Sequence, residues 1–115
     1  MDKPVIYACS DSLGETAERV ARAAASQYDK QEFHIVRMPY IRSEQQIEEI
    51  VKKAIDENAM ICYTIISPAL RKKLQALTAG THISVVDIIG PMMNGIGTLT
   101  NTCLLYTSDA ADDRI

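Results

Sequence analysis

The chain has 115 residues, of which 47% are hydrophobic and 23% charged, and its formal net charge is −3. These values fit one soluble domain. Twelve Lys and Arg against 15 Asp and Glu exclude a globally basic surface for nucleic acid. No apolar run approaches the roughly 18 residues of a membrane span, and the N-terminus lacks a signal-peptide core, so we expect a cytoplasmic protein.

The first predicted element is a buried strand over residues 5–9, which are apolar and precede a polar turn beginning at Ser10. From Glu15 the apolar residues recur every three or four positions, which predicts an amphipathic helix over about 15–28. Ser12, three residues before Glu15, has the spacing of a capping box, so we expect the helix to start there.

A second strand is predicted over residues 33–38, where the run is again apolar and ends at a proline. Ser43 and Gln46 repeat the capping-box spacing, and the apolar stripe behind them indicates a helix that ends near Asn58.

The third predicted strand, residues 60–66, is apolar almost throughout, which is typical of a parallel strand covered on both faces. Ser67-Pro68 then forms a cap and first turn of a helix that stops at Gly80. A fourth strand over 84–89 is followed by a break at Gly90-Pro91. Strand and helix thus alternate four times.

This alternation predicts an α/β fold: an open, mainly parallel four-stranded sheet with helices on both faces, in a Rossmann-like three-layer arrangement. We expect the first strand to be central, because its residues are apolar on both alternating faces.

Residues 103–115 do not continue the pattern. Read back into codons, they resemble one frame of a transposon-end sequencing adapter. We therefore assign the α/β domain to residues 1–102 and interpret 103–115 as a cloning or assembly scar. A genuine, weakly structured terminus is the alternative.

The candidate functional residues lie at the carboxyl ends of strands, where open parallel sheets bind ligands and helix N-termini offer free N–H groups. Hydroxyls and N–H groups there suit a phosphate, and a carboxylate suits a cation or a hydroxyl proton. The pattern is neither a dinucleotide fingerprint nor a nucleotide loop. The candidates for phosphate binding or for the active cleft are Ser10, Asp11, Ser12, Gly14, Thr16 and Asp87.

Each polar candidate also has a structural interpretation. Helix capping alone explains Ser12 with Glu15. Asp11 could bind a metal, act as a base or compensate a helix dipole. Asp87 is either a buried carboxylate bonded to a neighbouring loop or a site residue. The basic residues 71–73 are interpreted as a solvated helix face, or as a patch for an acidic partner.

The three cysteines, at positions 9, 62 and 103, are an odd number without metal-ligand spacing. Two of them lie inside apolar strands, where a thiol behaves as a small hydrophobe. The sequence therefore identifies neither a disulfide framework nor a metal site.

Two runs, residues 5–18 and 85–93, resemble the pyruvate, phosphate dikinase regulatory protein family, which includes the phosphoenolpyruvate synthase regulators. The run Ser-Asp-Ser-Leu-Gly-Glu-Thr-Ala-Glu, residues 10–18, is closer to the dikinase branch. The similarity covers about residues 4–102. Shorter supporting segments are residues 23–28, 37–41 and 64–71.

The resemblance implies a bifunctional serine/threonine kinase and phosphorylase. Such an enzyme uses ADP to phosphorylate a threonine of pyruvate, phosphate dikinase, which inactivates it. It uses inorganic phosphate to remove that group, releasing pyrophosphate. ADP and phosphate are then substrates, and the dikinase, or phosphoenolpyruvate synthase, is the protein partner. A homo-oligomer stays open.

In the family, the nucleotide-binding glycine-rich loop, with its lysine and hydroxyl residue, lies in the second half of the protein. No such loop occurs in these 115 residues, so the resemblance is to the N-terminal α/β domain alone. Two roles for this domain stay open. Its loops contribute to phosphate binding or the active cleft, or it is a non-catalytic module that docks the target.

Overall fold

The computed structural model describes residues 3–28 and 32–101. It contains a four-stranded sheet of order β2-β1-β3-β4, in which all neighbouring strands are parallel. The predicted α/β fold with a parallel sheet is confirmed. The interpretation of residues 103–115 as a scar lies outside the described residues. The strands are β1 (Val5–Cys9), β2 (His34–Met38), β3 (Met60–Tyr63) and β4 (Val85–Asp87).

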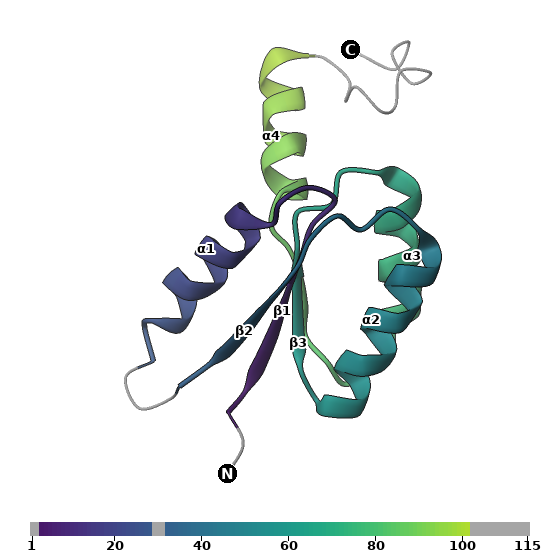
Figure 1. The fold of residues 1–115 in the computed structure, drawn as a ribbon. Helices are drawn as coiled ribbons and strands as arrows, with labels where there is room; N and C mark the ends of the chain where they lie inside the picture. The colour runs from purple at the N-terminus through teal and green to yellow at the C-terminus, as the bar shows by residue number, and fades with distance from the viewer. Residues whose placement is uncertain (1–2, 29–31, 102–115) are drawn as a thin grey trace.

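The helices cover both faces of the sheet, as expected. Figure 1 shows α1 on one face, α2 and α3 side by side on the other, and α4 extending beyond the carboxyl ends of the strands. Among the described residues, no helix has the length and apolar character that crossing a bilayer requires. The helices are α1 (Glu15–Ala25), α2 (Glu44–Glu57), α3 (Pro68–Thr78) and α4 (Gly90–Thr100).

The position of β1 determines where the order of the strands reverses. β1 lies between β2 and β3, which confirms that it is a central strand. The chain moves from β1 to one neighbour through α1, then crosses back through α2 to the other neighbour on the opposite face. The topological switch point is therefore between β1 and β3, at their carboxyl ends.

Local signals in the sequence start and stop α2 and α3 where predicted. The Ser43 hydroxyl accepts a hydrogen bond from the Gln46 N–H at 3.2 Å, and the Gln46 side chain accepts one from the Ser43 N–H at 3.0 Å. Asn58 ends α2 in the left-handed conformation, with φ of 57°. The Ser67 hydroxyl caps α3 ahead of a first-turn proline.

The predicted capping box of Ser12 and Glu15 is wrong. The residue that precedes α1 is Gly14, with φ of +88°, and no side chain caps this helix. Ser12 instead donates its N–H to the Ser10 hydroxyl at 3.0 Å. A turn within the loop therefore competes successfully for the serine that the spacing had assigned to the helix.

The third and fourth strands are shorter than predicted, and Gly90-Pro91 is not simply a break. These two residues begin α4. Proline is tolerated in the first turn of a helix because the N–H that it lacks would have no partner within the helix. β3 ends at Tyr63, and Thr64 and Ile66 beyond it line a cavity.

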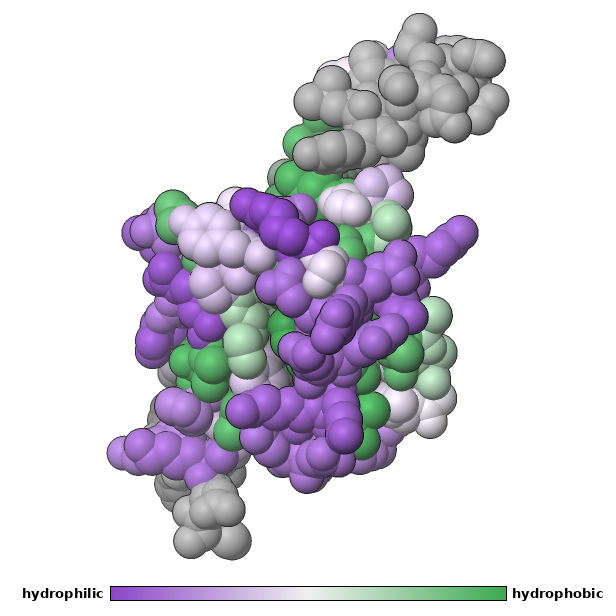
Figure 2. All heavy atoms as spheres, turned by 45° about the vertical axis from the view of Figure 1, so that its right-hand side comes forward, coloured by the Kyte–Doolittle hydropathy of each residue, from purple (hydrophilic) through white to green (hydrophobic). Residues whose placement is uncertain are grey.

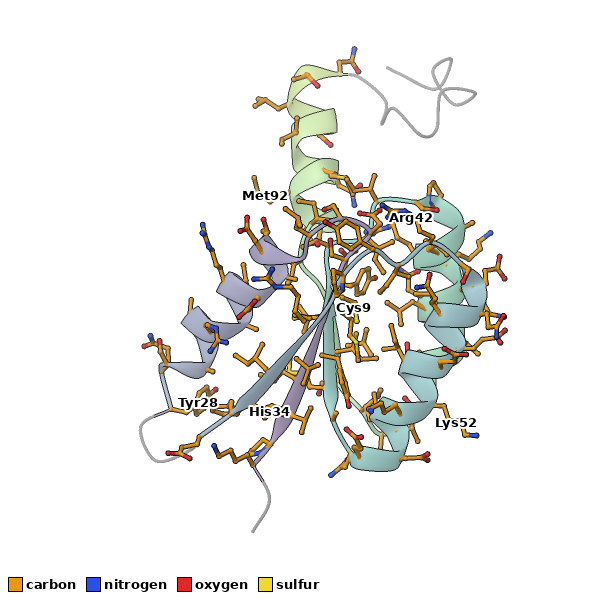
Figure 3. All side chains as sticks on the ribbon, viewed as in Figure 1. Cys9, Tyr28, His34, Arg42, Lys52 and Met92 are labelled. Carbon is orange, nitrogen blue, oxygen red and sulfur yellow. The ribbon has the colours of Figure 1, made fainter. Side chains whose placement is uncertain are left out.

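The core has two layers, one on each face of the sheet. Along β1, Tyr7 and Cys9 belong to the cluster under α2 and α3, whereas Ile6 and Ala8 belong to the smaller cluster under α1. Figure 3 shows Cys9 within the packed layer beside the sheet. The alternation follows from the two-residue period of a strand, so both faces of β1 are apolar as the sequence indicates.

We predict that Cys9 and Cys62 react slowly with maleimide at pH 8 in the folded protein. Burial raises the pKa of the Cys9 thiol to about 12 and that of the Cys62 thiol to about 11, and the thiolate is the reactive form. Brief alkylation followed by peptide mass spectrometry measures each thiol separately, with the urea-unfolded chain as control. Equal labelling rates in the folded and unfolded chains would contradict the prediction.

The same shifts predict a loss of stability at alkaline pH. A raised pKa means that the folded state holds the proton more tightly. The protonated thiols therefore make their full contribution to the free energy of unfolding below their ordinary pKa of 9.0. This contribution is lost as the pH rises toward the pKa values of the folded state. Urea titrations at pH 8 and pH 10.5, compared with a Cys9→Ala, Cys62→Ala variant, check this dependence.

Candidate functional site

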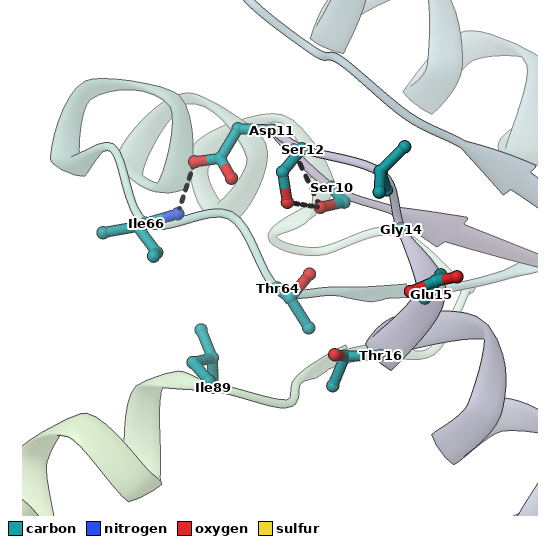
Figure 4. A pocket seen from close by; sticks show the side chains of 10 residues that line it. Ser10, Asp11, Ser12, Gly14, Glu15, Thr16, Thr64, Ile66 and Ile89 are labelled. Atoms are coloured by element: carbon teal, nitrogen blue, oxygen red, sulfur yellow. Dashed lines mark hydrogen bonds between the residues drawn. The ribbon is translucent and has the colours of Figure 1, made fainter.

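A cavity of about 280 Å³ lies at the carboxyl ends of β1 and β3, at the switch point of the sheet. Figure 4 shows one wall formed by the loop after β1 and the start of α1, with Thr64 and Ile66 opposite and Ile89 from the segment before α4. Asp87 is not among its lining residues. The predicted candidates that line the cavity are Ser10, Asp11, Ser12, Gly14 and Thr16.

Ser10 shapes the turn that begins this loop. Its side chain is buried, and its hydroxyl accepts the Ser12 N–H at 3.0 Å and lies 3.3 Å from the Ser12 hydroxyl. The Ser10 N–H donates to the carbonyl of Met38 on β2. Ser10 therefore fixes the loop, while Ser12 is exposed and lines the cavity.

Asp11 joins the loops that follow the two central strands. Its Oδ2 accepts a hydrogen bond from the N–H of Ile66 at 2.9 Å (Figure 4). In the part of the chain that the structure describes, no donor bonds its other oxygen, Oδ1. One oxygen thus holds the carboxylate in a fixed position and leaves the second one able to accept a proton or bind a cation.

Gly14 is required by its own conformation and by its neighbour. Its φ of +88° is favourable for glycine, and a Cβ built there would lie 2.8 Å from Cγ of Arg37. The Arg37 guanidinium pairs with Glu18 of α1 at 2.6 Å. Because Arg22 and Arg37 both bond Glu18, they lower the pKa of its carboxyl. Arg37 therefore anchors α1 to β2 beside the cavity.

The cavity offers hydrogen-bond donors but no positive side chain. The N-terminus of α1 has no side-chain cap, so the first-turn N–H groups are free to meet an anion. Thr16 and Thr64 add hydroxyls. The charged residues among those lining the cavity are Asp11 and Glu15, both acidic. An anionic ligand here needs its compensating cation from a residue that does not line this cavity.

Asp87 makes the structural contacts that the first of its two sequence interpretations describes, while its role as a site residue stays a prediction. Its carboxylate forms a bidentate ion pair with Arg71 of α3, with Nη1 3.2 Å from Oδ1, and accepts the Gly90 N–H at 2.8 Å. The pair joins α3 to the start of α4.

The interpretation of residues 71–73 as a solvated face is therefore wrong for Arg71, whose side chain is only 19% exposed. Lys73 is partly exposed and pairs at 3.0 Å with Glu48 of α2. These two basic residues hold α3 against its neighbours, and they do not form a free patch for an acidic partner.

Thr64, Ile66 and Ile89 are lining residues that the sequence interpretation did not select. Thr64 and Ile66 lie inside the predicted third strand, whose apolar sequence gave no sign of a binding role. The signal that could have found Thr64 is the strand order, because the carboxyl ends of adjacent parallel strands meet at the same edge.

No metal centre is assigned. Within residues 3–28 and 32–101, no three His, Cys, Asp or Glu side chains group in a way that could hold a metal ion.

The fold and the cavity define an open parallel α/β domain with a crevice at its switch point that is lined by both polar and apolar residues. A model of the kinase/pyrophosphorylase family matches residues 6–111, and the chain belongs to this family.

Curated relatives with the name pyruvate, phosphate dikinase regulatory protein are similar to most of the chain. The protein from Carboxydothermus hydrogenoformans is 41% identical over 84% of this chain and 35% of its own length. That from Halalkalibacterium halodurans is 39% identical over 85% and 36%, and that from Alkaliphilus oremlandii 44% over 80% and 33%. The chain thus spans about a third of the length of these relatives.

We predict that Gly14→Ala lowers the free energy of unfolding by about 1 kcal/mol more than Gly80→Ala does. Both glycines have positive φ, but a Cβ at Gly80 meets nothing within 4 Å, whereas one at Gly14 meets Arg37. Urea titrations measure both losses. In an Arg37→Ala background the difference should vanish, and a difference that persists there would show that Arg37 is not its cause.

Proposed function

We propose that this chain is part of a bifunctional protein kinase and pyrophosphorylase that regulates pyruvate, phosphate dikinase. In this proposal, the full-length protein inactivates the dikinase by ADP-dependent phosphorylation of a threonine. It restores activity by phosphate-dependent removal of that group, releasing pyrophosphate. Membership of the kinase/pyrophosphorylase family and the names of the relatives support it.

The observation that gives this domain its role is the cavity at the switch point. Both proposed reactions involve phosphoryl groups, and the cavity combines an uncapped helix N-terminus with hydroxyls from Ser12, Thr16 and Thr64. Such groups donate hydrogen bonds to phosphoryl oxygens. We therefore propose that the loop after β1 forms one side of the active cleft.

The acidic character of the cavity fits a shared cleft better than a site for free phosphate. Asp11 and Glu15 repel a bare anion, so the transferred group needs a cation that the cavity lining does not contain, and we propose that the rest of the full-length protein supplies it. The family's nucleotide loop carries a lysine of this kind. Asp11, with Oδ1 free, then accepts the proton of the attacking hydroxyl group or holds that hydroxyl in line.

We predict that Asp11→Asn in the full-length protein reduces turnover in at least one direction more than tenfold, which is about 1.4 kcal/mol of barrier. Asparagine keeps an oxygen that can accept the Ile66 N–H, so the link between the loops survives while the charge is lost. Phosphorylation and dephosphorylation of purified dikinase, followed with labelled substrate, measure both directions.

Asp56→Asn is the matched control, because it makes the same chemical change at an exposed position of α2. It should leave both rates unchanged. If Asp11→Asn folds with native stability and also leaves both rates unchanged, Asp11 only holds the loops together and the proposed cleft is wrong.

We also predict that these 115 residues alone transfer no phosphoryl group to or from the dikinase. They contain no nucleotide loop to position ADP and neutralise its charge. The assay is the same labelled transfer, with the full-length protein as positive control. ADP-dependent labelling of the dikinase by this chain above the no-enzyme background would show that the chain holds the catalytic machinery itself.

A further inference from the structure

The two faces of the sheet are covered unequally. Two helices, α2 and α3, pack on one face, whereas α1 packs on the other over β2 and β1 and reaches the near side of β3 (Figure 1). Beyond α1, the face formed by β3 and β4 borders an apolar groove of about 460 Å³. An α/β fold of three layers normally covers such a surface with a helix.

The groove is apolar along its whole length. α1 contributes Val20, Ala21 and Ala24, and the sheet side contributes Ile6, Val86 and Ile88. Val20 and Val86 are each 43% exposed.

Alternation along β4 explains why Val86 faces the groove. Val85 packs against the core under α2 and α3, and Asp87 pairs with Arg71 of α3, so Val86 projects to the opposite face. The strand is therefore built to be covered on both faces, and within the described residues one of them is bare.

Helix α4 carries a second exposed apolar surface. Met92, Ile96 and Leu99 follow one another at steps of four and three residues, which places them on one side of the helix. They are 62%, 52% and 85% exposed. Figure 2 shows hydrophobic side chains on α4 above the largely hydrophilic body of the molecule, and Figure 3 shows Met92 at the base of this helix.

We propose that a helix from the remaining two thirds of the full-length polypeptide packs in this groove, against α1 and the exposed face of β3 and β4. The curated relatives are about three times as long as the segment they share with this chain. A segment of the same polypeptide is present at high effective concentration, so it needs less binding energy than a separate molecule.

The size and the lining of the groove suit one helix better than a second copy of the chain. Ala21 and Ala24 are small, which lets a helix backbone approach α1 closely. The groove has room for one helix beside α1. A stable interface between two proteins needs a larger surface, roughly 800 Å² on each partner. The expected helix carries an apolar stripe at three- and four-residue spacing.

The first test uses a full-length family member carrying these residues, with a photo-crosslinking amino acid at Val86. We expect an adduct within one polypeptide, mapped by peptide mass spectrometry to a segment outside this chain. The same amino acid at Ala23, on the other side of α1, is the control and should give no such adduct. An adduct joining two copies, an adduct to another protein, adducts confined to this chain, or none would overturn the proposal.

The second test measures accessibility in the same full-length protein. Val20→Cys should react with maleimide at least tenfold more slowly than Ala23→Cys, because both positions are exposed on α1 in the present structure and only Val20 faces the groove. Ala24→Cys, a smaller change that also faces the groove, replaces Val20→Cys if that variant fails to fold. Equal rates inside and outside the groove would overturn the proposal.

Discussion

The loop after β1 is held from both sides by hydrogen bonds, and the shape of the cavity depends on this constraint. On one side, the Tyr40 N–H donates to the Ser12 carbonyl and the Ile41 N–H to the Ser10 carbonyl, each at 2.9 Å. On the other side, Asp11 accepts the Ile66 N–H. The hydroxyls and N–H groups that line the cavity are thus positioned before any ligand arrives, which reduces the reorganisation that binding would require.

Much of the fold could be predicted because the decisive signals are local. The boundaries of β1 follow from five apolar residues before a polar turn, and α2 follows from Ser43 with Gln46 at its start and Asn58 at its end. The candidate residues of the loop after β1 were also predictable, since the carboxyl end of a central parallel strand is where such folds place ligands. The structure places these loop residues at one cavity, while their role in binding stays a prediction.

The features that the sequence did not predict come from a competing local turn in one case and from a contact between distant segments in the other. Ser12 has the spacing of a cap, but the turn held by Ser10 takes it, and Gly14 begins α1 instead. Arg71 looks solvated on its own helix, yet Asp87 pairs with it from a strand 16 residues later. No local pattern contains the strand order that makes these neighbours.

Helix α1 links the cavity to the groove. Thr16, in its first turn, lines the cavity, and Val20 and Ala21, one turn further along, line the groove. If a helix from the rest of the polypeptide fills the groove, it contacts α1 one turn beyond Thr16, next to the N–H groups of the first turn. The position of the first-turn N–H groups of α1 then depends on a contact outside the cavity. A displacement of about 1 Å in such groups can lower a catalytic rate strongly. Packing of the halves and assembly of the cleft would therefore be one event.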